Sequence, residues 1–386
     1  MIYLDNGATS YPKPPEMLEA VADAMRNYCA NPGRSGHFMA AKTAQEIFKT
    51  RLAAARLFRI EDPSRILFTK NCTEAINLAL KGILRQADHV VTSSMEHNSV
   101  IRPLKQLEKR EITTTVVACD ADGRIDVEDI KNAVQPNTKM IVITAASNVT
   151  GTKMPLEEIG RFALRKGILF MVDGAQGVGH MPIDVKKDHI DILAAPGHKG
   201  LLGPQGTGFL YVRGEIPVTP LLEGGTGNKS KELQQPHDFP EGYEAGTVNA
   251  PGIIGLGASM NVISRIGIEA IEAHERKLTE KLQSGLKQIP EVTLYGPEDP
   301  AEKTAVVAMN IAGMDCEETA ALLNDEYGIA VRAGFHCSGM AHETIGTADI
   351  GCVRLCPGIY TGEKEIEKTV EAVRQIVKRR HIQTDF

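Results

Sequence analysis

The chain has 386 residues, of which 42% are hydrophobic and 24% charged, as in an ordinary globular protein of about two domains. The formal net charge is −6 and the basic residues are scattered, so nothing in the composition indicates a nucleic-acid or anionic-lipid partner. No apolar stretch is long enough to span a bilayer, and the first residues lack the basic and apolar segments of a signal peptide. We therefore expect a cytoplasmic protein without nucleic-acid or membrane partners.

The seven cysteines are odd in number and include no CxxC pair. In a long chain without a secretory signal this pattern argues against a disulfide framework and for a reducing compartment. Cys352 and Cys356 lie four residues apart, but no histidine or cysteine stands at zinc-finger spacing from them. Because closed zinc sites normally need four ligands, we expect no metal site.

From about residue 65 onward, short apolar segments alternate with segments of helical period. The predicted strands cover residues 66–69, 89–92, 114–117, 140–144, 168–172, 192–195 and 208–212. The predicted helices between them cover residues 73–84, 100–109, 127–134 and 156–166. This alternation predicts an α/β fold with a mostly parallel, doubly wound sheet, in which ligands bind outside the carboxyl ends of the strands.

The remainder of the chain has a different pattern. Residues 222–244 are rich in Gly, Pro, Lys and Gln and predict a long loop. Helices follow from 251 to about 288, then a strand at 306–311, a helix at 317–326, a strand at 351–355 and a helix at 363–379. We predict an N-terminal segment (1–15) packed on the small domain, a large domain (16–250) and a smaller α+β domain (251–386).

The most informative residues are Lys199, inside a glycine-rich loop after one predicted strand, and Asp173, at the end of the preceding one. A lysine amine forms a Schiff base with the aldehyde of pyridoxal 5'-phosphate (PLP), and a carboxylate keeps the pyridine nitrogen protonated so that the ring accepts electrons. The pair therefore predicts a PLP cofactor. Asn148 and His97 also follow predicted strands, so we expect them at the same edge of the sheet.

Asn71 opens a predicted helix, with Glu74 at capping-box spacing. The segment is either a helix cap alone or a phosphate site at the helix N-terminus, with the Thr73 hydroxyl as a further donor. The downstream Lys199 favours the phosphate site. His97 is either a structural histidine or one that stacks on the pyridine ring and moves protons.

Cys337 lies in the segment Arg332-Ala-Gly-Phe-His-Cys337, which is followed by serine and glycine. We expect a flexible, exposed loop in which Arg332 and His336 lower the pKa of the thiol. The alternative is a buried structural cysteine, and we interpret the other cysteines as packing residues in helices or strands. Arg354, at a predicted strand end, either holds a substrate carboxylate in a bidentate fork or forms an ordinary surface ion pair.

With these motifs the chain resembles the class V aminotransferases of PLP fold type I, and among them the cysteine desulfurases. The likeness runs nearly end to end. The matching segments are residues 3–9, 30–34, 72–77, 96–97, 147–151, 173–176, 197–199, 244–247, 332–337 and 352–354. Because few residues separate Arg332 from Arg354, the cysteine loop is similar to that of the SufS-like group.

The resemblance implies a role for each matching site residue. The cofactor contacts are Lys199 as Schiff-base lysine, Asp173 on the pyridine nitrogen, Gln176 on the phenolic oxygen, His97 on the ring, and Thr73, His198 and, across a homodimer interface, Thr247 on the phosphate. Asn148 and Arg354 position the substrate amino acid, and Cys337 is the nucleophile. Two positions depart from the family: Pro196 replaces a phosphate-binding serine, and Cys72 stands where threonine is common.

We therefore predict a homodimeric, PLP-dependent cysteine desulfurase that converts L-cysteine to L-alanine and passes sulfur through a Cys337 persulfide to an acceptor protein or small thiol. The destination of the sulfur stays open between iron–sulfur cluster assembly, thio-modified tRNA and a cofactor. The alternatives are a selenocysteine lyase acting on L-selenocysteine, another class V aminotransferase or lyase, and a non-catalytic scaffold. Retention of the five residues Lys199, Asp173, His97, Arg354 and Cys337 argues against the scaffold.

Overall fold

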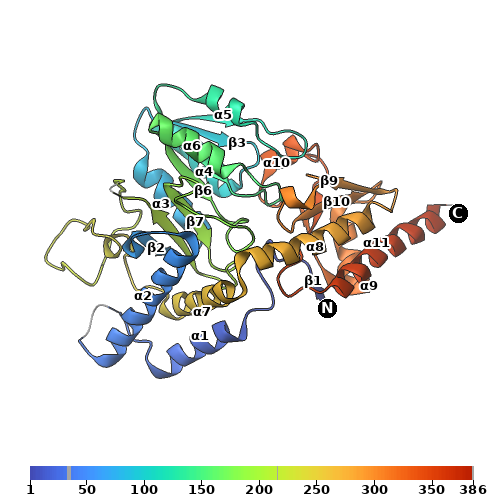
Figure 1. Ribbon diagram of the computed structural model, residues 1–386. Coiled ribbons are helices and arrows are strands. Elements are labelled where there is room, and N and C mark those ends of the chain that lie inside the picture. Colours follow the sequence, from blue (N-terminus) through green and yellow to red (C-terminus); the bar gives the residue numbers. More distant parts are fainter. Residues whose placement is uncertain (33–35, 215, 385–386) are drawn as a thin grey trace.

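The computed structural model describes residues 1–32, 36–214 and 216–384. Gly33 and Arg34, which belong to the matching segment 30–34, lie outside the described residues. Figure 1 shows a large sheet flanked by helices, and a smaller group of strands and helices at the other end of the molecule. The N-terminus lies beside this smaller group, next to β1.

A seven-stranded sheet forms the centre of the large part. In spatial order its strands are β2 (Ile66–Thr69), β8 (Gly208–Val212), β7 (Ile192–Pro196), β6 (Leu169–Asp173), β5 (Thr138–Thr144), β3 (His89–Ser93) and β4 (Thr113–Val117). All run in one direction except β8, which is antiparallel to both neighbours. The predicted α/β class with a mostly parallel sheet is confirmed.

Helices cover both faces of this sheet, which explains why its strands are apolar almost throughout. Val90 packs on one face against α3 (Cys72–Ile83) and α4 (Asn98–Leu107). Its neighbour Val91 packs on the other face, in a core shared with α2 (Phe38–Phe58), α5 (Val127–Ala133), α6 (Leu156–Lys166) and α7 (Ala250–Ile266). Successive side chains of a strand point to opposite faces, so one apolar run supplies both cores.

The smaller part is built on an antiparallel sheet of β12 (Arg332–Gly334), β13 (Cys352–Leu355), β10 (Val307–Ile311) and β9 (Val292–Tyr295). Its helices are α8 (Ile268–Leu286), α9 (Cys316–Tyr327), α10 (Gly339–Thr344) and α11 (Glu363–Thr384). β1 (Ile2–Tyr3) pairs in parallel with β11 (Ile329–Ala330), so the N-terminal segment contacts this part. α1 (Pro15–Asn27) packs instead against α7.

The predicted elements lie within a few residues of the observed ones, and residues 222–240 hold no helix or strand before a 3-10 turn at Glu241–Tyr243. The segment after Arg332 is different from the expected flexible loop, because it forms β12, a turn and α10. Cys29 and Cys119 lie in loops and are only half-buried, contrary to their assignment to helices or strands. Local period could not show these features, since β12 and α10 are only three and six residues long.

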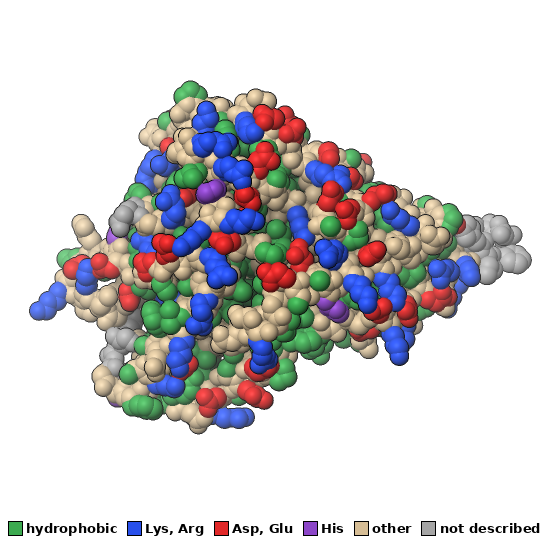
Figure 2. Space-filling model, in the orientation of Figure 1, with side chains coloured by type: hydrophobic (Ala, Val, Ile, Leu, Met, Phe, Trp, Pro, Cys, Tyr) green, Lys and Arg blue, Asp and Glu red, His purple; other side chains and the backbone are tan. Residues whose placement is uncertain are grey.

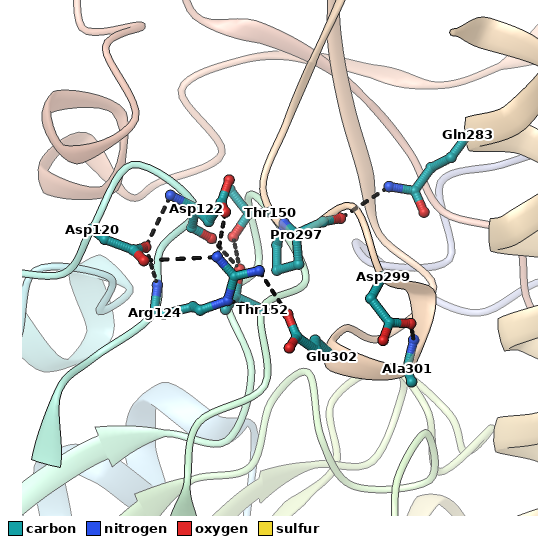
Figure 3. A network of polar contacts seen from close by, with 10 residues as sticks. All are labelled: Asp120, Asp122, Arg124, Thr150, Thr152, Gln283, Pro297, Asp299, Ala301 and Glu302. Atoms are coloured by element: carbon teal, nitrogen blue, oxygen red, sulfur yellow. Dashed lines mark hydrogen bonds and ion pairs between the residues drawn. The ribbon is translucent and has the colours of Figure 1, made fainter.

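Polar contacts join the small part to the loops that follow β4 and β5 (Figure 3). In the loop after β4, the Arg124 guanidinium pairs with Asp122 and reaches Glu302 across the junction at 2.6 Å. Thr152, in the loop after β5, donates its hydroxyl hydrogen to the Asp122 carbonyl at 2.6 Å. These contacts link the two loops to each other and to the small part.

The contacts of α7 bear on the division into domains. Ile253, Leu256 and Met260 of α7 belong to the same core as the large sheet and α2. α7 and α8 meet at a 79° bend, and Gly267 between them has φ 92°, a conformation that favours glycine. The packing therefore favours a boundary near Gly267 rather than after residue 250. The division itself stays a prediction.

No single helix in the described part of the chain combines the length and apolar character needed to cross a membrane; the bent pair α7–α8 meets those criteria only when taken together. Figure 2 shows basic and acidic side chains interspersed over one face of the molecule.

A buried ion pair ties the long polar loop to the large part. Arg51 of α2 contacts both carboxylate oxygens of Glu244 at 2.5 Å, and the two side chains are 4% and 9% exposed. Glu244 also accepts the Phe68 amide hydrogen at 2.6 Å, and the Arg51 guanidinium lies 4.6 Å from the Phe68 ring centre. Burial raises the pKa of Glu244, and Arg51 opposes that shift. The pair fixes the start of the segment that carries Thr247.

Arg51→Ala should lower the free energy of unfolding by about 3–5 kcal/mol, because it leaves the Glu244 carboxylate buried without its partner. Urea denaturation of the cofactor-saturated protein measures this loss. The matched control is Lys49→Ala on the same helix, whose exposed pair with Glu46 is worth no more than about 1 kcal/mol. Equal effects of the two changes would contradict the role given to the buried pair.

Candidate active site

The candidate site lies where the carboxyl ends of the parallel strands meet. β6 ends at Asp173, and β7 leads directly into His198 and Lys199. β3 and β5 end four residues before His97 and Asn148, respectively. Parallel strands bring these ends to one edge of the sheet, so residues far apart in the sequence lie together.

A cavity of about 190 Å³ opens at this edge. Among the predicted site residues it is lined by Thr73, His97, Asn148, Asp173, Gln176, His198 and Lys199. Cys337, Arg354 and Thr247 are not part of this lining. The lining also includes Asn71, Cys72 and Pro196, which the sequence singled out for other reasons, and Ser99, Thr144 and Ala175, to which it assigned no role.

Asp173 is 1% exposed, and the hydrogen bonds to its carboxylate involve one of the two oxygens. Its Oδ1 accepts the Ala175 amide hydrogen at 2.9 Å and lies 3.4 Å from the Cys72 sulfur, which donates to it. Burial and the neighbouring carboxylate raise the pKa of the Cys72 thiol well above its usual value, so Cys72 stays protonated. In the described part of the chain, both hydrogen bonds to the Asp173 carboxylate use Oδ1, so Oδ2 can accept from a further partner.

Lys199 follows β7 in a loop whose backbone packs closely against the backbone at Val178. A Cβ at Gly200 would lie 2.2 Å from the Val178 carbonyl oxygen, so only glycine fits after the lysine. Burial, reinforced by the Arg354 cation, lowers the pKa of Lys199, while Asp173 opposes that shift. A lysine with a lowered pKa supplies more of the neutral amine that reacts with aldehydes.

The N-terminus of α3 faces the cavity. Asn71 caps the helix by accepting the Glu74 amide hydrogen at 2.9 Å. The Thr73 hydroxyl lies 2.8 Å from the Ser99 hydroxyl, which in turn lies 2.8 Å from His97 Nδ1. A helix N-terminus with hydroxyl donors suits an anion, so the observed helix cap at Asn71 is compatible with a phosphate at the same end of α3.

His97 is the N-cap of α4, and its Nδ1 accepts the Ser99 amide hydrogen at 3.0 Å. Burial lowers the pKa of His97, so the ring is neutral with its hydrogen on Nε2. Burial also raises the pKa of the adjacent Glu96 to about 8. Glu96 accepts a hydrogen bond from the Thr144 amide at 2.9 Å, so an uncharged carboxyl lies next to Thr144 of the cavity lining.

His198 presents a buried Nδ1 that has no hydrogen-bond partner in the described part of the chain. Burial and the cations of Lys199 and Lys13 lower the pKa of His198 to about 4, so the imidazole is neutral. The carbonyl of His198 accepts hydrogen bonds from the Ser10 amide at 3.0 Å and the Lys13 ammonium at 2.8 Å. The N-terminal segment therefore closes this side of the site.

Cys337 is exposed and lies in the turn between β12 and α10. His336 beside it is 4% exposed, and its Nε2 lies 3.1 Å from the Cys352 carbonyl oxygen. Burial and the Arg354 cation lower the pKa of His336 to about 3, so at neutral pH the ring carries no charge. The expectation that His336 stabilises a Cys337 thiolate as a cation is therefore wrong. Of the two proposed neighbours, Arg332 alone supplies a positive charge.

His336, His342 and Cys352 place metal-ligating atoms within 4.8 Å of one another. The Arg354 cation that depresses the His336 pKa also disfavours a divalent ion at this position.

Arg354 on β13 is 2% exposed, which excludes the alternative of a surface ion pair. Its Nη2 lies 3.1 Å from Asp5 Oδ1, and its Nη1 donates to the Asn148 carbonyl at 2.9 Å. A Cβ at Gly7 would lie 3.2 Å from the Arg354 Cζ, so the N-terminal segment packs tightly on the guanidinium. Gln176 donates from Nε2 to the Gly7 carbonyl at 2.9 Å.

The residues fit PLP. The buried His198 Nδ1, which lacks a partner in the described part of the chain, and the N-terminus of α3 suit a phosphate. The Asp173 Oδ2 suits a pyridinium hydrogen. The Lys199 side chain lines the same cavity. Pro196 lines the cavity without a donor, as its sequence implies. Ser99 and Cys72 were missed by the sequence reasoning. The only signals were the i, i+2 spacing of Ser99 from His97 and the departure at position 72.

Comparison with known proteins shows which family has this sequence and fold. The class V aminotransferase family model matches residues 2–369. A probable cysteine desulfurase of Methanothermobacter thermautotrophicus is 37% identical, over 97% of this chain and 94% of its own. The cysteine desulfurase of Haloferax volcanii is 32% identical, over 97% and 88%.

Solved structures of cysteine desulfurases have a similar fold. The apo cysteine desulfurase of Thermococcus onnurineus superposes with a TM-score of 0.93 at 34% identity, covering 98% of this chain and 94% of that one. The cysteine desulfurase CsdA of Escherichia coli gives 0.86 at 28% identity, covering 97% and 94%. The chain belongs to the class V aminotransferase family, whose members use PLP.

Proposed function

We propose that this chain is a PLP-dependent cysteine desulfurase, which converts L-cysteine to L-alanine and takes the sulfur onto Cys337. The observation that carries the proposal is the placement of Lys199 and Asp173 on one cavity, with an exposed Cys337 docked beside it. The Cys337 carbonyl accepts the amide hydrogen of Asn98, the first residue of α4, and the next residue back is His97 of the cavity. The relatives named above support the same activity.

When bound, PLP supplies an electron sink that stabilises negative charge on the substrate carbon. Asp173 would hold the pyridine nitrogen through Oδ2, and His97 would contact the ring. Gln176 would serve the phenolic oxygen. Thr73, His198 and the end of α3 would hold the phosphate, and Ser99 would provide the hydroxyl that Pro196 cannot.

Lys199 and Cys337 carry the two chemical tasks. The Lys199 Nζ takes a proton from the substrate and later returns one, because its lowered pKa keeps part of the amine unprotonated. The Cys337 thiolate attacks the substrate sulfur. A sulfur–sulfur bond forms as the carbon–sulfur bond breaks, and the carbon keeps the electron pair and is protonated to give alanine. An acceptor thiol then removes the terminal sulfur.

The substrate carboxylate requires a cation, and Arg354 is the proposed one, with Asn148 beside it. In the structure Arg354 contacts Asp5 and the Asn148 carbonyl, so the carboxylate would compete with Asp5 for the guanidinium. The Cα of Arg332 pairs with that of Arg354 across β12 and β13, which keeps a second cation nearby. Two adjacent arginines favour an anionic substrate group.

The finer assignments are part of the same proposal. The compact β12–turn–α10 arrangement supports the SufS-like group with its short cysteine loop. All seven cysteines are free thiols, which supports a reducing cytoplasm. Thr247 is exposed and lies outside the cavity, which supports a homodimer in which it serves the partner's phosphate. An acceptor protein or small thiol completes the reaction.

Asp173→Ala should retain PLP but lose turnover by about a hundredfold or more, because an unprotonated ring is a poor electron sink and a key electrostatic partner is gone. Alanine production from L-cysteine measures the loss, and the visible absorption band measures the cofactor. Near-normal alanine production would contradict the role of this carboxylate.

Cys337→Ser should abolish persulfide formation and alanine production from L-cysteine while keeping the visible PLP band, because a hydroxyl cannot accept sulfur as a persulfide. Turnover of L-selenocysteine should persist, since selenium can leave without the thiol. Alkylation and mass spectrometry locate the persulfide. The matched control is Cys29→Ser, a half-buried thiol outside the site. Unchanged alanine production, or a persulfide on Cys72 or Cys356, would exclude this mechanism.

Mixing two variants with complementary defects tests the homodimer. Thr247→Ala should weaken PLP binding about tenfold by removing a phosphate hydrogen bond, and Lys199→Ala should be inactive. A mixed dimer has one site with an intact Lys199 and an intact partner Thr247, so that site should regain wild-type affinity for PLP. Light scattering checks the mass. An active monomer, or no recovery on mixing, would rule out the shared phosphate site.

A further inference from the structure

The turn that carries Cys337 has an unusual backbone. His336 and Cys337 are consecutive non-glycine residues with φ of 48° and 58°, in the left-handed region. There an L-residue brings its Cβ close to the following carbonyl oxygen, so the conformation is disfavoured unless the surroundings impose it. Something outside the turn must therefore hold the nucleophile in place.

We propose that Asn148 and Ser338 form a clamp that holds this turn and positions the Cys337 thiol for sulfur transfer. In this proposal Asn148 is also a positioning residue for the nucleophile, in addition to its place beside Arg354. The inference rests on the desulfurase function proposed above.

The Asn148 side chain is used at both ends by the turn. Its Nδ2 donates to the His336 carbonyl at 2.7 Å, and its Oδ1 accepts the Ser338 hydroxyl hydrogen at 2.8 Å. The two bonds reach the residues on either side of Cys337. The Asn148 amide therefore holds the residues immediately before and after Cys337.

The clamp is buried while the nucleophile is not. Asn148, Ser338 and His336 are 7%, 0% and 4% exposed, whereas Cys337 is exposed. Hydrogen bonds in such surroundings are costly to leave unmade, so the turn cannot readily exchange them for water. The Asn98 amide adds a bond to the Cys337 carbonyl at 2.9 Å. Cys337 therefore stays exposed while the residues on either side of it are held inside.

The other side of the clamp is anchored in the sheet edge. Asn148 lines the cofactor cavity, and its own carbonyl accepts from Arg354 at 2.9 Å. The following residues form a tight turn, in which the Ser147 hydroxyl accepts the Val149 and Thr150 amide hydrogens at 3.2 Å. The clamp therefore fixes the nucleophile relative to the cavity. A substrate sulfur bound there meets a thiol whose position is already set.

Ser338→Ala tests the clamp, because it removes the bond to Asn148 Oδ1 without touching the cavity. In the PLP-loaded enzyme, kcat for L-cysteine should fall about fivefold to tenfold, the equivalent of one hydrogen bond. The L-cysteine concentration that half-saturates the visible spectral change should stay the same, and so should turnover of L-selenocysteine. The matched control is Ser259→Ala, a buried serine whose hydroxyl bonds Leu256 within α7.

Hydrogen exchange supplies a readout that does not depend on activity. In Ser338→Ala the amides of residues 335–340 should exchange faster, with or without PLP, while the rest of the chain is unchanged. Equal losses with L-cysteine and L-selenocysteine would overturn the clamp, and so would unchanged exchange or unchanged kcat for L-cysteine. Failure of the desulfurase proposal shows separately, as alanine production by Cys337→Ser, whatever Ser338→Ala does.

Discussion

The whole site depends on one constraint, the common direction of β2, β3, β5, β6 and β7. Parallel strands place their carboxyl ends at one edge, and the helices α3 and α4, which follow β2 and β3, start there with their positive ends toward the same space. The lysine after β7, the aspartate at the end of β6 and the capped start of α3 are brought together by this geometry alone. Antiparallel β8 supplies no site residue, because its carboxyl end points the other way.

Burial sets the charge state of the edge. Burial lowers the pKa of His198 to about 4 and raises that of Glu96 to about 8, so both side chains are held in their uncharged forms. The pKa of Lys199 is lowered as well. The charge balance follows from removing water rather than from adding ion pairs.

The small part contributes the exposed Cys337 and the buried Arg354, so the proposed reaction needs both parts in register. The contacts of Arg124 with Glu302, and of Arg354 with Asp5 and Asn148, all cross between segments far apart in the chain. The Arg354 guanidinium reaches Asn148 in the loop after β5, and Thr152 of that loop bonds Asp122 in the loop after β4, where Arg124 lies. The loop after β5 therefore connects the small sheet to the cofactor edge, and Asn148 is its residue in contact with Arg354.

The sequence by itself determined the parallel α/β sheet, the placement of Lys199 and Asp173 at one edge of that sheet, and the helix cap at Asn71. These follow from apolar runs and from the residues that end them, which are local patterns. The tertiary structure alone decided that His336 is neutral, that Cys72 contacts Asp173 and that the Cys337 turn is clamped. These features depend on burial and on contacts across long separations, 190 residues between Asn148 and Ser338 and 349 between Asp5 and Arg354. No local period encodes such contacts, because they exist only once the two sheets have packed together.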